Sequence, residues 1–259
     1  MSFIKQYWKT LLFFAVVGLF GGFCTGLYLL DSYPADIQQT LVEELNGAGL
    51  GSIPAHIAMG ILTALQGASY GVICGALGIL LGKKVGLWRE ERFLEKGPLT
   101  VALLLAVIGG LFMILPDMLY FCGQSQALKD SYAVKPTLAY IIGCLTYGAV
   151  IEEVMVRLFF MSLVAFLLHK IFEKGKVEPS QAVLIIANLL SAVLFAAGHL
   201  PATFLLLGNT PALLVRCFLL NGGLGFLFGW LYQKYGLRYA MIAHGVCHIV
   251  SKLLWILFI

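Results

Sequence analysis

The chain has 259 residues, of which 60% are hydrophobic and only 12% are charged. Soluble domains are closer to half apolar and a quarter charged, so this composition excludes an ordinary soluble domain and indicates a multi-pass membrane protein. The net charge of +4 is small, and the basic residues form no patch, which argues against a nucleic-acid partner.

Apolar runs long enough to cross a bilayer recur along the whole chain. The first is too long for the core of a cleaved signal peptide and is interpreted as a retained span. The fourth is too long for one upright helix, so it must tilt, kink or split, which allows for an eighth span. We therefore predict an all-α, polytopic transmembrane helical bundle of about seven to eight spans. The runs lie at about 10–30, 55–82, 98–116, 136–168, 181–207, 211–232 and 239–259.

Basic residues predict the orientation of the bundle. Lysine and arginine are concentrated before the first span and after the second, fourth and sixth spans, which all fall on one side if the spans alternate. The positive-inside rule then places the N-terminus in the cytoplasm of a multi-pass cell-membrane protein. We expect residues 1–135 to form about three N-terminal spans with interfacial helices, and residues 136–259 to form a core of about four to five spans.

Two connections and several glycine pairs carry structural signals. The segments 35–45 and 87–96 are amphipathic, and each is predicted to form an interfacial helix. Glycines spaced four apart, such as Gly71 and Gly75, allow helices to approach closely. The six cysteines form no CxxC pair and are expected to be ordinary buried thiols.

Three charged residues interrupt the fourth apolar run, in GAVIEEVMVRLFF at 148–160. Each charge near the bilayer centre costs about 2.5–3.5 kcal/mol on insertion scales, so each needs a partner or a polar cavity. Glu153 and Arg157 are four residues apart and share one helical face, which predicts a structural ion pair. Glu152 lies about 100° around the helix from Glu153 and has no local cation. A buried carboxylate of this kind is a candidate general acid or base.

Three of the five histidines, His199, His244 and His248, also lie inside apolar runs. A single histidine in a span is more often a packing residue than a ligand, but three of them with an unpaired glutamate favour a polar site. His244 and His248 have the spacing of the two zinc ligands in HExxH helices. Three imidazoles and one carboxylate are chemically adequate for zinc with an open water position. The tentative ligands are Glu152, His199, His244 and His248.

The motifs that contain these residues resemble those of a known family. EEVMVR at 152–157 matches an EExxxR motif, FAAGH at 195–199 matches FxxxH, and HGVCH at 244–248 takes the place of HxxxN. In this order, each within a hydrophobic segment, they resemble the CPBP family of CAAX prenyl proteases and bacteriocin-processing proteins, also called the Abi family. The resemblance covers about the C-terminal half of the chain, 136–259.

The resemblance implies an α-helical intramembrane endopeptidase, commonly labelled a metalloprotease. It implies that Glu152 activates the attacking water with help from His199. His244 and the residue at 248 would position the water or stabilise the oxyanion. By the same resemblance, Glu153 with its partner arginine would hold the site together.

One position departs from the family pattern. His248 stands where the family usually has asparagine, and an imidazole can either donate to an oxyanion or bind zinc. Asn221 could supply an amide instead, although bonding between helices is the expected use of polar residues such as Asn188, Asn221 and Arg216. Straight helices would place His199 and His244 near opposite ends of the bundle, so the site requires a tilted, offset or broken span. Pro201 marks a candidate break.

We predict a peptide hydrolase of CPBP type that acts on a peptide or membrane-protein substrate, with zinc as a candidate cofactor. The alternative is a non-catalytic protein of the same fold that acts in bacteriocin self-immunity or as a scaffold. A transporter or proton relay is disfavoured because the sequence has no internal repeat. The short loops favour a prokaryotic membrane, and hence a bacteriocin leader or membrane-protein segment over a CAAX peptide.

Overall fold

The computed structural model describes residues 3–90 and 93–259, and every regular element in these ranges is helical. Among the described residues, six stretches are apolar and long enough to cross a membrane. The predicted all-α, polytopic membrane fold is therefore confirmed. The stretches are Phe3–Ser32 (α1), Ala55–Lys84 (α3), Lys96–Gly123, Gln181–Leu207, Pro211–Tyr235 and Leu237–Phe258 (α12).

Three of these stretches are divided by short irregularities in the helical backbone. Their parts are α4 (Lys96–Leu119), η1 (Phe121–Gly123), α8 (Gln181–Gly198), α9 (Leu200–Leu207), α10 (Pro211–Cys217), η4 (Phe218–Gly222) and α11 (Gly223–Tyr235).

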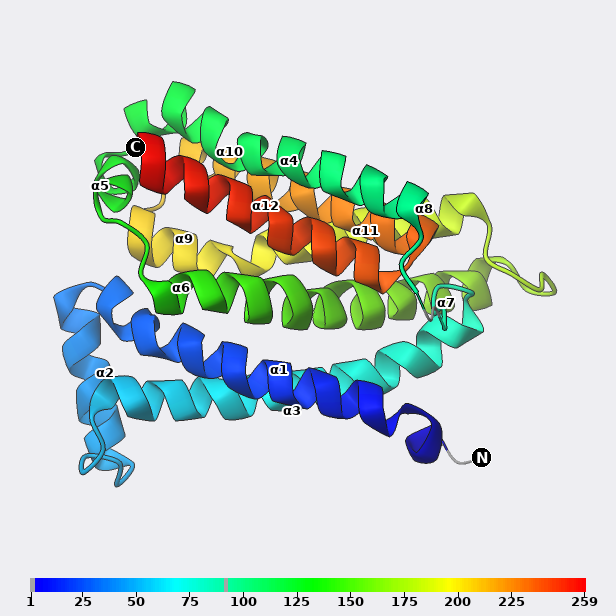
Figure 1. Ribbon diagram of the computed structural model, residues 1–259, viewed down its shortest axis with the longest axis horizontal. Helices are drawn as coiled ribbons and strands as arrows, with labels where there is room; N and C mark the ends of the chain where they lie inside the picture. Colours follow the sequence, from blue (N-terminus) through cyan, green and yellow to red (C-terminus); the bar gives the residue numbers. More distant parts are fainter. Residues whose placement is uncertain (1–2, 91–92) are drawn as a thin grey trace.

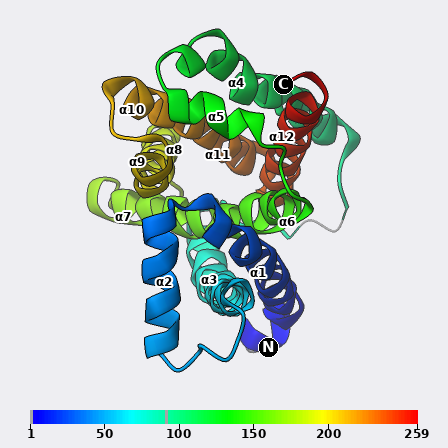
Figure 2. The ribbon, with the colours of Figure 1, turned by 90° about the vertical axis from the view of Figure 1, so that its left-hand side faces the viewer.

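The long fourth run forms one continuous helix, which we call the central helix. It consists of α6 (Leu138–Gly143), η2 (Cys144–Glu152), η3 (Val154–Met161) and α7 (Ser162–Phe172), and its middle has wider, π-helical hydrogen bonding. Figures 1 and 2 show this helix as a layer between the α1–α3 pair and the remaining helices. The run does not split into two helices. Six stretches of the described residues qualify as candidate spans, so the predicted count of seven to eight is approximate.

The two amphipathic connections have different structures. Residues Ala35–Gly47 form helix α2, as predicted for 35–45. The predicted helix at 87–96 is wrong where it is described: 87–90 and 93–95 are not helical, and 91–92 lie outside the described residues. Instead, the backbone N–H groups of residues 87 and 88 donate to the Gly82 carbonyl, and the Trp88 ring packs edge-on against Tyr7.

This connection is also tied to α1 by a charged group. The Tyr7 hydroxyl donates a hydrogen bond to Glu90, and the Lys83 ammonium lies 3.7 Å from the same carboxylate. The hydrogen bond from Tyr7, together with the Lys83 charge, lowers the pKa of Glu90. The described residues 87–90 are therefore held against α1 and α3.

Glycine allows α1 and α3 to approach within backbone contact. A Cβ atom at Gly71 would lie only 2.7 Å from the Phe14 carbonyl oxygen. The central helix meets this pair in the same way, because a Cβ atom at Gly143 would lie 2.8 Å from Thr25 Oγ1 and one at Gly78 would lie 2.8 Å from the Leu158 carbonyl. The small residues thus serve the close packing that their spacing predicts.

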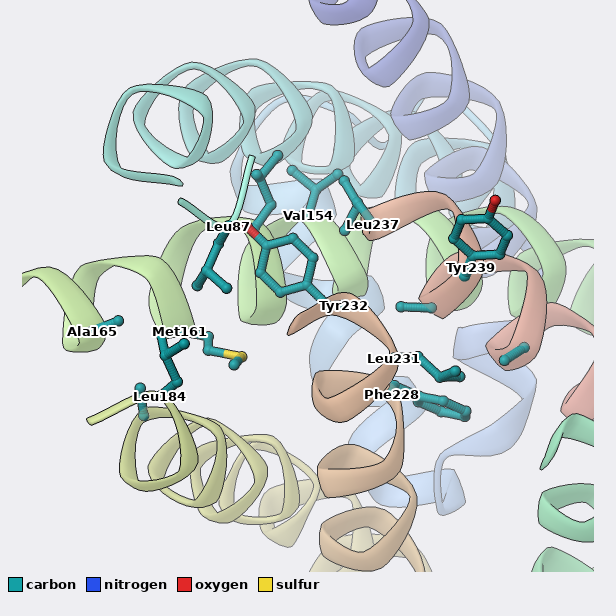
Figure 3. Packing of buried hydrophobic residues seen from close by; sticks show 14 of the residues in the cluster. Leu87, Val154, Met161, Ala165, Leu184, Phe228, Leu231, Tyr232, Leu237 and Tyr239 are labelled. Carbon is teal, nitrogen blue, oxygen red and sulfur yellow. The ribbon is translucent and has the colours of Figure 1, made fainter. Parts of the chain in front are cut away.

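Apolar packing continues on the other side of the central helix. Val154 and Met161 of η3 contribute to a buried cluster with Leu184 of α8 and with Phe228 and Tyr232 of α11. Figure 3 shows these side chains converging from the three helices. The cluster fixes α8 and α11 against the segment that contains Glu153 and Arg157.

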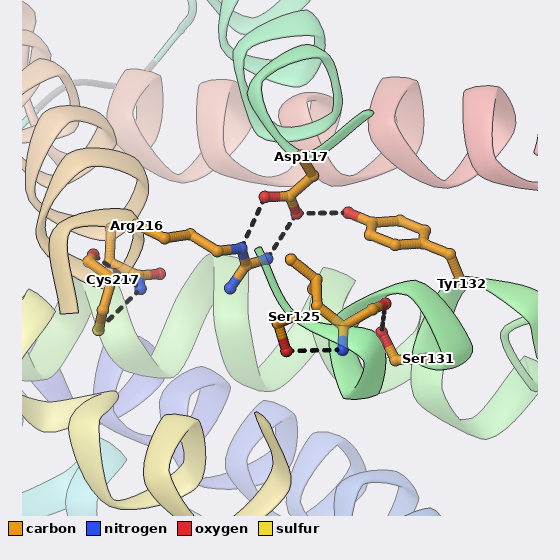
Figure 4. Close-up of polar contacts among 8 residues, drawn as sticks. Asp117, Ser125, Ser131, Tyr132, Arg216 and Cys217 are labelled. Carbon is orange, nitrogen blue, oxygen red and sulfur yellow. Dashed lines mark hydrogen bonds and ion pairs between the residues drawn. The ribbon is translucent and has the colours of Figure 1, made fainter. Parts of the chain in front are cut away.

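A polar network closes one end of the bundle. The guanidinium of Arg216 in α10 donates two hydrogen bonds of 2.6 Å to the carboxylate of Asp117 in α4, and the Tyr132 hydroxyl donates a third of 2.7 Å. Figure 4 shows this arrangement. Asp117 is completely buried, and the bidentate arginine supplies the partner that such a charge requires.

The glycine contact between α1 and α3 yields a stability prediction. Gly71→Ala should lower the free energy of unfolding by about 1–3 kcal/mol, because the new methyl group overlaps the Phe14 backbone. Thermal unfolding in detergent would show this as a lower Tm. Gly97→Ala is the matched control, since a Cβ atom there would meet no other atom within 4 Å. Equal melting temperatures for both variants would contradict the prediction.

Candidate functional site

Three elements contribute the predicted site residues. Glu152 and Glu153 lie where η2 and η3 of the central helix meet, His199 separates α8 from α9, and both His244 and His248 lie on α12. Glu152, His199 and His248 are partly accessible, whereas Glu153 is fully buried.

Glu153 is the most connected of these residues. Its Oε1 accepts a hydrogen bond of 2.9 Å from His244 Nδ1, and its Oε2 lies 3.3 Å from Arg157 Nε. The ion pair predicted from the i, i+4 spacing is therefore present, and both of its side chains are fully buried. The contact with His244 was not predicted, because the two residues are 91 positions apart and no local pattern joins them.

Arg157 is enclosed on all sides. Its Nη2 donates to the Gly225 carbonyl oxygen at 3.1 Å, and its guanidinium carbon lies 4.5 Å from the ring centre of Phe195 and 5.9 Å from that of Phe228. Two aromatic faces and one carboxylate thus surround the cation in a region that excludes water. The contact with Glu153 is a charge contact without good hydrogen-bond alignment, which leaves Arg157 Nε unpartnered.

The two histidines of α12 form part of an aromatic stack. The ring of His244 lies 4.6 Å from that of Phe228 at an interplanar angle of 18°, and 4.9 Å from that of His248 at 28°. Both rings project from one face of α12, as their spacing predicts. His248 Nδ1 is buried without a hydrogen-bond partner among the described residues.

His199 is held by the end of its own helix. Its Nδ1 lies 2.8 Å from the Phe195 carbonyl oxygen. Because a carbonyl can only accept, Nδ1 bears the proton, and the neutral ring has its free lone pair on Nε2. The Phe195 ring lies 4.7 Å from that of His199 and 6.2 Å from that of His244, so it bridges α8 and α12. The break that permits this lies at His199, where α8 ends and α9 begins just before Pro201.

Glu152 differs from its neighbour in having no direct partner. Its carboxylate makes no hydrogen bond or ion pair with the described residues, although the rings of His199 and His244 lie within electrostatic range. His199 and His244 lie within the same range of His248. The structure therefore places the four predicted residues in one region of the bundle, with Glu152 lacking a hydrogen-bond or ion-pair partner among the described residues.

The other polar residues of the spans lie outside this cluster. Asn188 Nδ2 donates to the Phe226 carbonyl oxygen of α11, a bond between helices as expected. Asn221 Nδ2 instead donates to the Cys217 carbonyl oxygen one turn earlier. The amide of Asn221 therefore satisfies its own helical segment and does not replace the asparagine that the family motif has at position 248.

As arranged, the donors do not fit a metal ion. Across residues 3–90 and 93–259, no three His, Cys, Asp or Glu side chains are grouped closely enough to hold one. The rings of His244 and His248 stack face to face, and the Nδ1 atoms of His199 and His244 are occupied by Phe195 and Glu153. Zinc binding stays a prediction, and the proposed hydrolysis is derived from the side chains alone.

A large groove lies next to the cluster but is separate from it. Its volume is about 1020 Å³, and it opens between α1, the 87–90 segment, the central helix and α12. Ala149 and Gly245 line its inner wall, whereas none of the four candidate residues does so. The groove is therefore not the chemical site itself.

The comparisons with known proteins bear on the C-terminal half. The model of a family described as "Type II CAAX prenyl endopeptidase Rce1-like" matches residues 134–250, a segment that contains all four candidate residues. Neither the curated proteins nor the solved structures gave a match. The family generally comprises intramembrane proteases, which supports peptidase activity at the family level. The resemblance found in the sequence is confirmed to the extent that the segment 134–250, a little under half of the chain, matches this family model.

Proposed function

We propose that the protein is an intramembrane endopeptidase in which Glu152 activates a water molecule for attack on a peptide bond. The observation that carries this proposal is the position of the Glu152 carboxylate inside a helical bundle, without a hydrogen-bond or ion-pair partner among the described residues and within electrostatic range of His199 and His244. A polar group of this kind within a membrane protein is costly, and such residues generally mark functional sites.

The first step requires a base for the attacking water. Glu152 would accept the water proton as the oxygen attacks the substrate carbonyl. His199 would orient the water through Nε2, because its Nδ1–H is already donated to the Phe195 carbonyl. The protonated Glu152 would then transfer its proton to the leaving amine, which completes hydrolysis without a further reagent.

The tetrahedral intermediate requires donors for its oxyanion. Glu153 accepts the Nδ1–H of His244, so it fixes the orientation of the ring. In the protonated form of this ring, Nε2–H would donate to the oxyanion. His248 stacks on His244 and has an unpartnered nitrogen, so it would act as a second donor in place of the usual asparagine.

The proposed substrate is a peptide presented from the membrane. The family description names prenylated CAAX substrates, and we propose a peptide with a prenylated cysteine as the first substrate to test. The basic residues flanking the spans support a cytoplasmic N-terminus in a cell membrane. The family match does not favour the non-catalytic alternative.

Loss of the base should abolish cleavage while the protein remains folded. Glu152→Gln and His199→Ala should each reduce kcat at least about 100-fold, the usual contribution of a positioned acid or base. The measurement is cleavage of a fluorogenic farnesylated peptide by purified protein in detergent. His56→Ala is the matched control, since the exposed His56 contacts Asp31 and is about 100 positions away from Glu152 in the sequence. Wild-type rates in both site variants would overturn the mechanism.

The two adjacent glutamates should differ in their effect on stability. Glu153→Gln leaves the Arg157 cation buried without a counter-charge, which should cost about 3–5 kcal/mol of unfolding free energy. Glu152→Gln removes no ion pair and should melt close to the wild-type Tm. Thermal unfolding of both purified variants provides the comparison, and equal destabilisation would contradict this division of roles.

A further inference from the structure

The face of α12 that contains the two histidines continues to a buried cation. His244, His248 and Lys252 follow one another at four-residue intervals and therefore share that face. Lys252 is only 7% exposed. Its Nζ lies 4.8 Å from the ring centre of Tyr140 in α6 and 5.4 Å from that of Trp255. The ammonium thus points into the bundle, towards the central helix, and does not extend to the surface.

The charge of Lys252 is not neutralised within the described chain, where Nζ makes no ion pair and no hydrogen bond. The nearby Arg216 is different, because Asp117 binds it with both carboxylate oxygens. Aromatic faces stabilise an ammonium but contribute no negative charge. A buried cation in this state is costly, and binding of an anion would offset that cost.

We propose that Lys252 binds the C-terminal carboxylate of the peptide that Glu152 cleaves, which makes Lys252 a determinant of substrate specificity. This inference rests on the proposed peptidase function. It assigns a role to a buried cation that the hydrolytic steps do not use.

The spacing along α12 sets the length of peptide that fits. Lys252 lies eight positions after His244, which corresponds to a rise of about 12 Å along the helix. An extended peptide covers about 3.3–3.6 Å per residue. A carboxylate held at Lys252 would therefore lie about three or four residues beyond a peptide bond positioned at His244. The site should prefer substrates that end shortly after the cleaved bond.

A lipid phosphate offers similar negative charge, but the position of the cation favours the peptide. Lys252 faces Tyr140 of the central helix, the same helix that contains Glu152, and has little exposed surface. A lipid headgroup would contact a cation on the outer surface more readily. Lys135 has that position, since it is exposed and bonds only to carbonyl oxygens of residues 255 and 256.

Two peptides that differ only at the C-terminus test the proposal. Both contain a farnesylated cysteine followed by three residues, and one ends in a free carboxylate whereas the other ends in a carboxamide. Wild-type protein should cleave the carboxylate with a kcat/KM about 10–100-fold higher, the range expected for a charge-assisted hydrogen bond. Lys252→Met should lose this preference through a higher KM for the carboxylate, with unchanged cleavage of the carboxamide.

Two matched variants complete the experiment. Lys135→Met removes a neighbouring lysine from the surface and should keep the wild-type preference. Lys252→Arg keeps the charge and should retain part of the preference, which also provides a result if Lys252→Met fails to fold. Binding of the two labelled peptides to Glu152→Gln measures the same preference without cleavage.

The outcomes distinguish a failure of the Lys252 role from a failure of the peptidase function. Cleavage or binding of both peptides with equal efficiency by wild-type protein would overturn the role of Lys252. Preferential binding of the carboxylate without any cleavage would support Lys252 while refuting the peptidase function. A preference for the carboxylate that survives in Lys252→Met would overturn the proposal. If wild-type protein binds phosphatidylglycerol vesicles and Lys252→Met does not, the cation binds a lipid instead.

Discussion

The carboxylate of Glu153 is the contact on which the site depends. It lies inside the bundle, where it meets a cation from its own helix through one oxygen and an imidazole of α12 through the other. A buried carboxylate requires both partners, so the central helix and α12 can pack in only one rotational setting around it. Phe195 and Phe228 cover the guanidinium of Arg157 and bring α8 and α11 to the same point. Four segments are therefore aligned by one charge and the groups that surround it.

This arrangement explains how two neighbouring glutamates acquire different properties. Glu153 is fully buried, with one oxygen bonded to His244 and the other 3.3 Å from Arg157, whereas Glu152 is partly accessible and has no such partner among the described residues. The proposed chemistry needs one rigid acid and one free acid within a few ångströms. Adjacent positions on one helix place two carboxylates in different environments without an additional loop or domain, because consecutive side chains leave the helix in different directions.

Hydropathy predicted the spans well, because the cost of exposing polar groups to lipid acts on each segment independently of its neighbours. It could not predict the 87–96 connection, where Leu87 is buried, Trp88 is half-buried, and both backbone N–H groups bond to Gly82 of α3, contacts that no periodicity encodes. The site was only partly predictable for the same reason. The pairing of Glu153 with Arg157 is local, but its pairing with His244 depends on helix packing. The Asp117–Arg216 pair, 99 positions apart, lacks any local signal at all.

The close packing of α1 on the central helix determines which fragments of the protein can fold. Gly21 of α1 packs against Thr146 of the central helix, and Gly143 of the central helix packs against Thr25 of α1, in both cases without room for a Cβ atom. Helix α3 makes a similar contact through Gly78. A fragment limited to the family segment 134–250 would expose this narrow, threonine-lined strip to lipid or detergent. We expect the smallest piece that folds to include α1 and α3, although the four candidate residues all lie outside them.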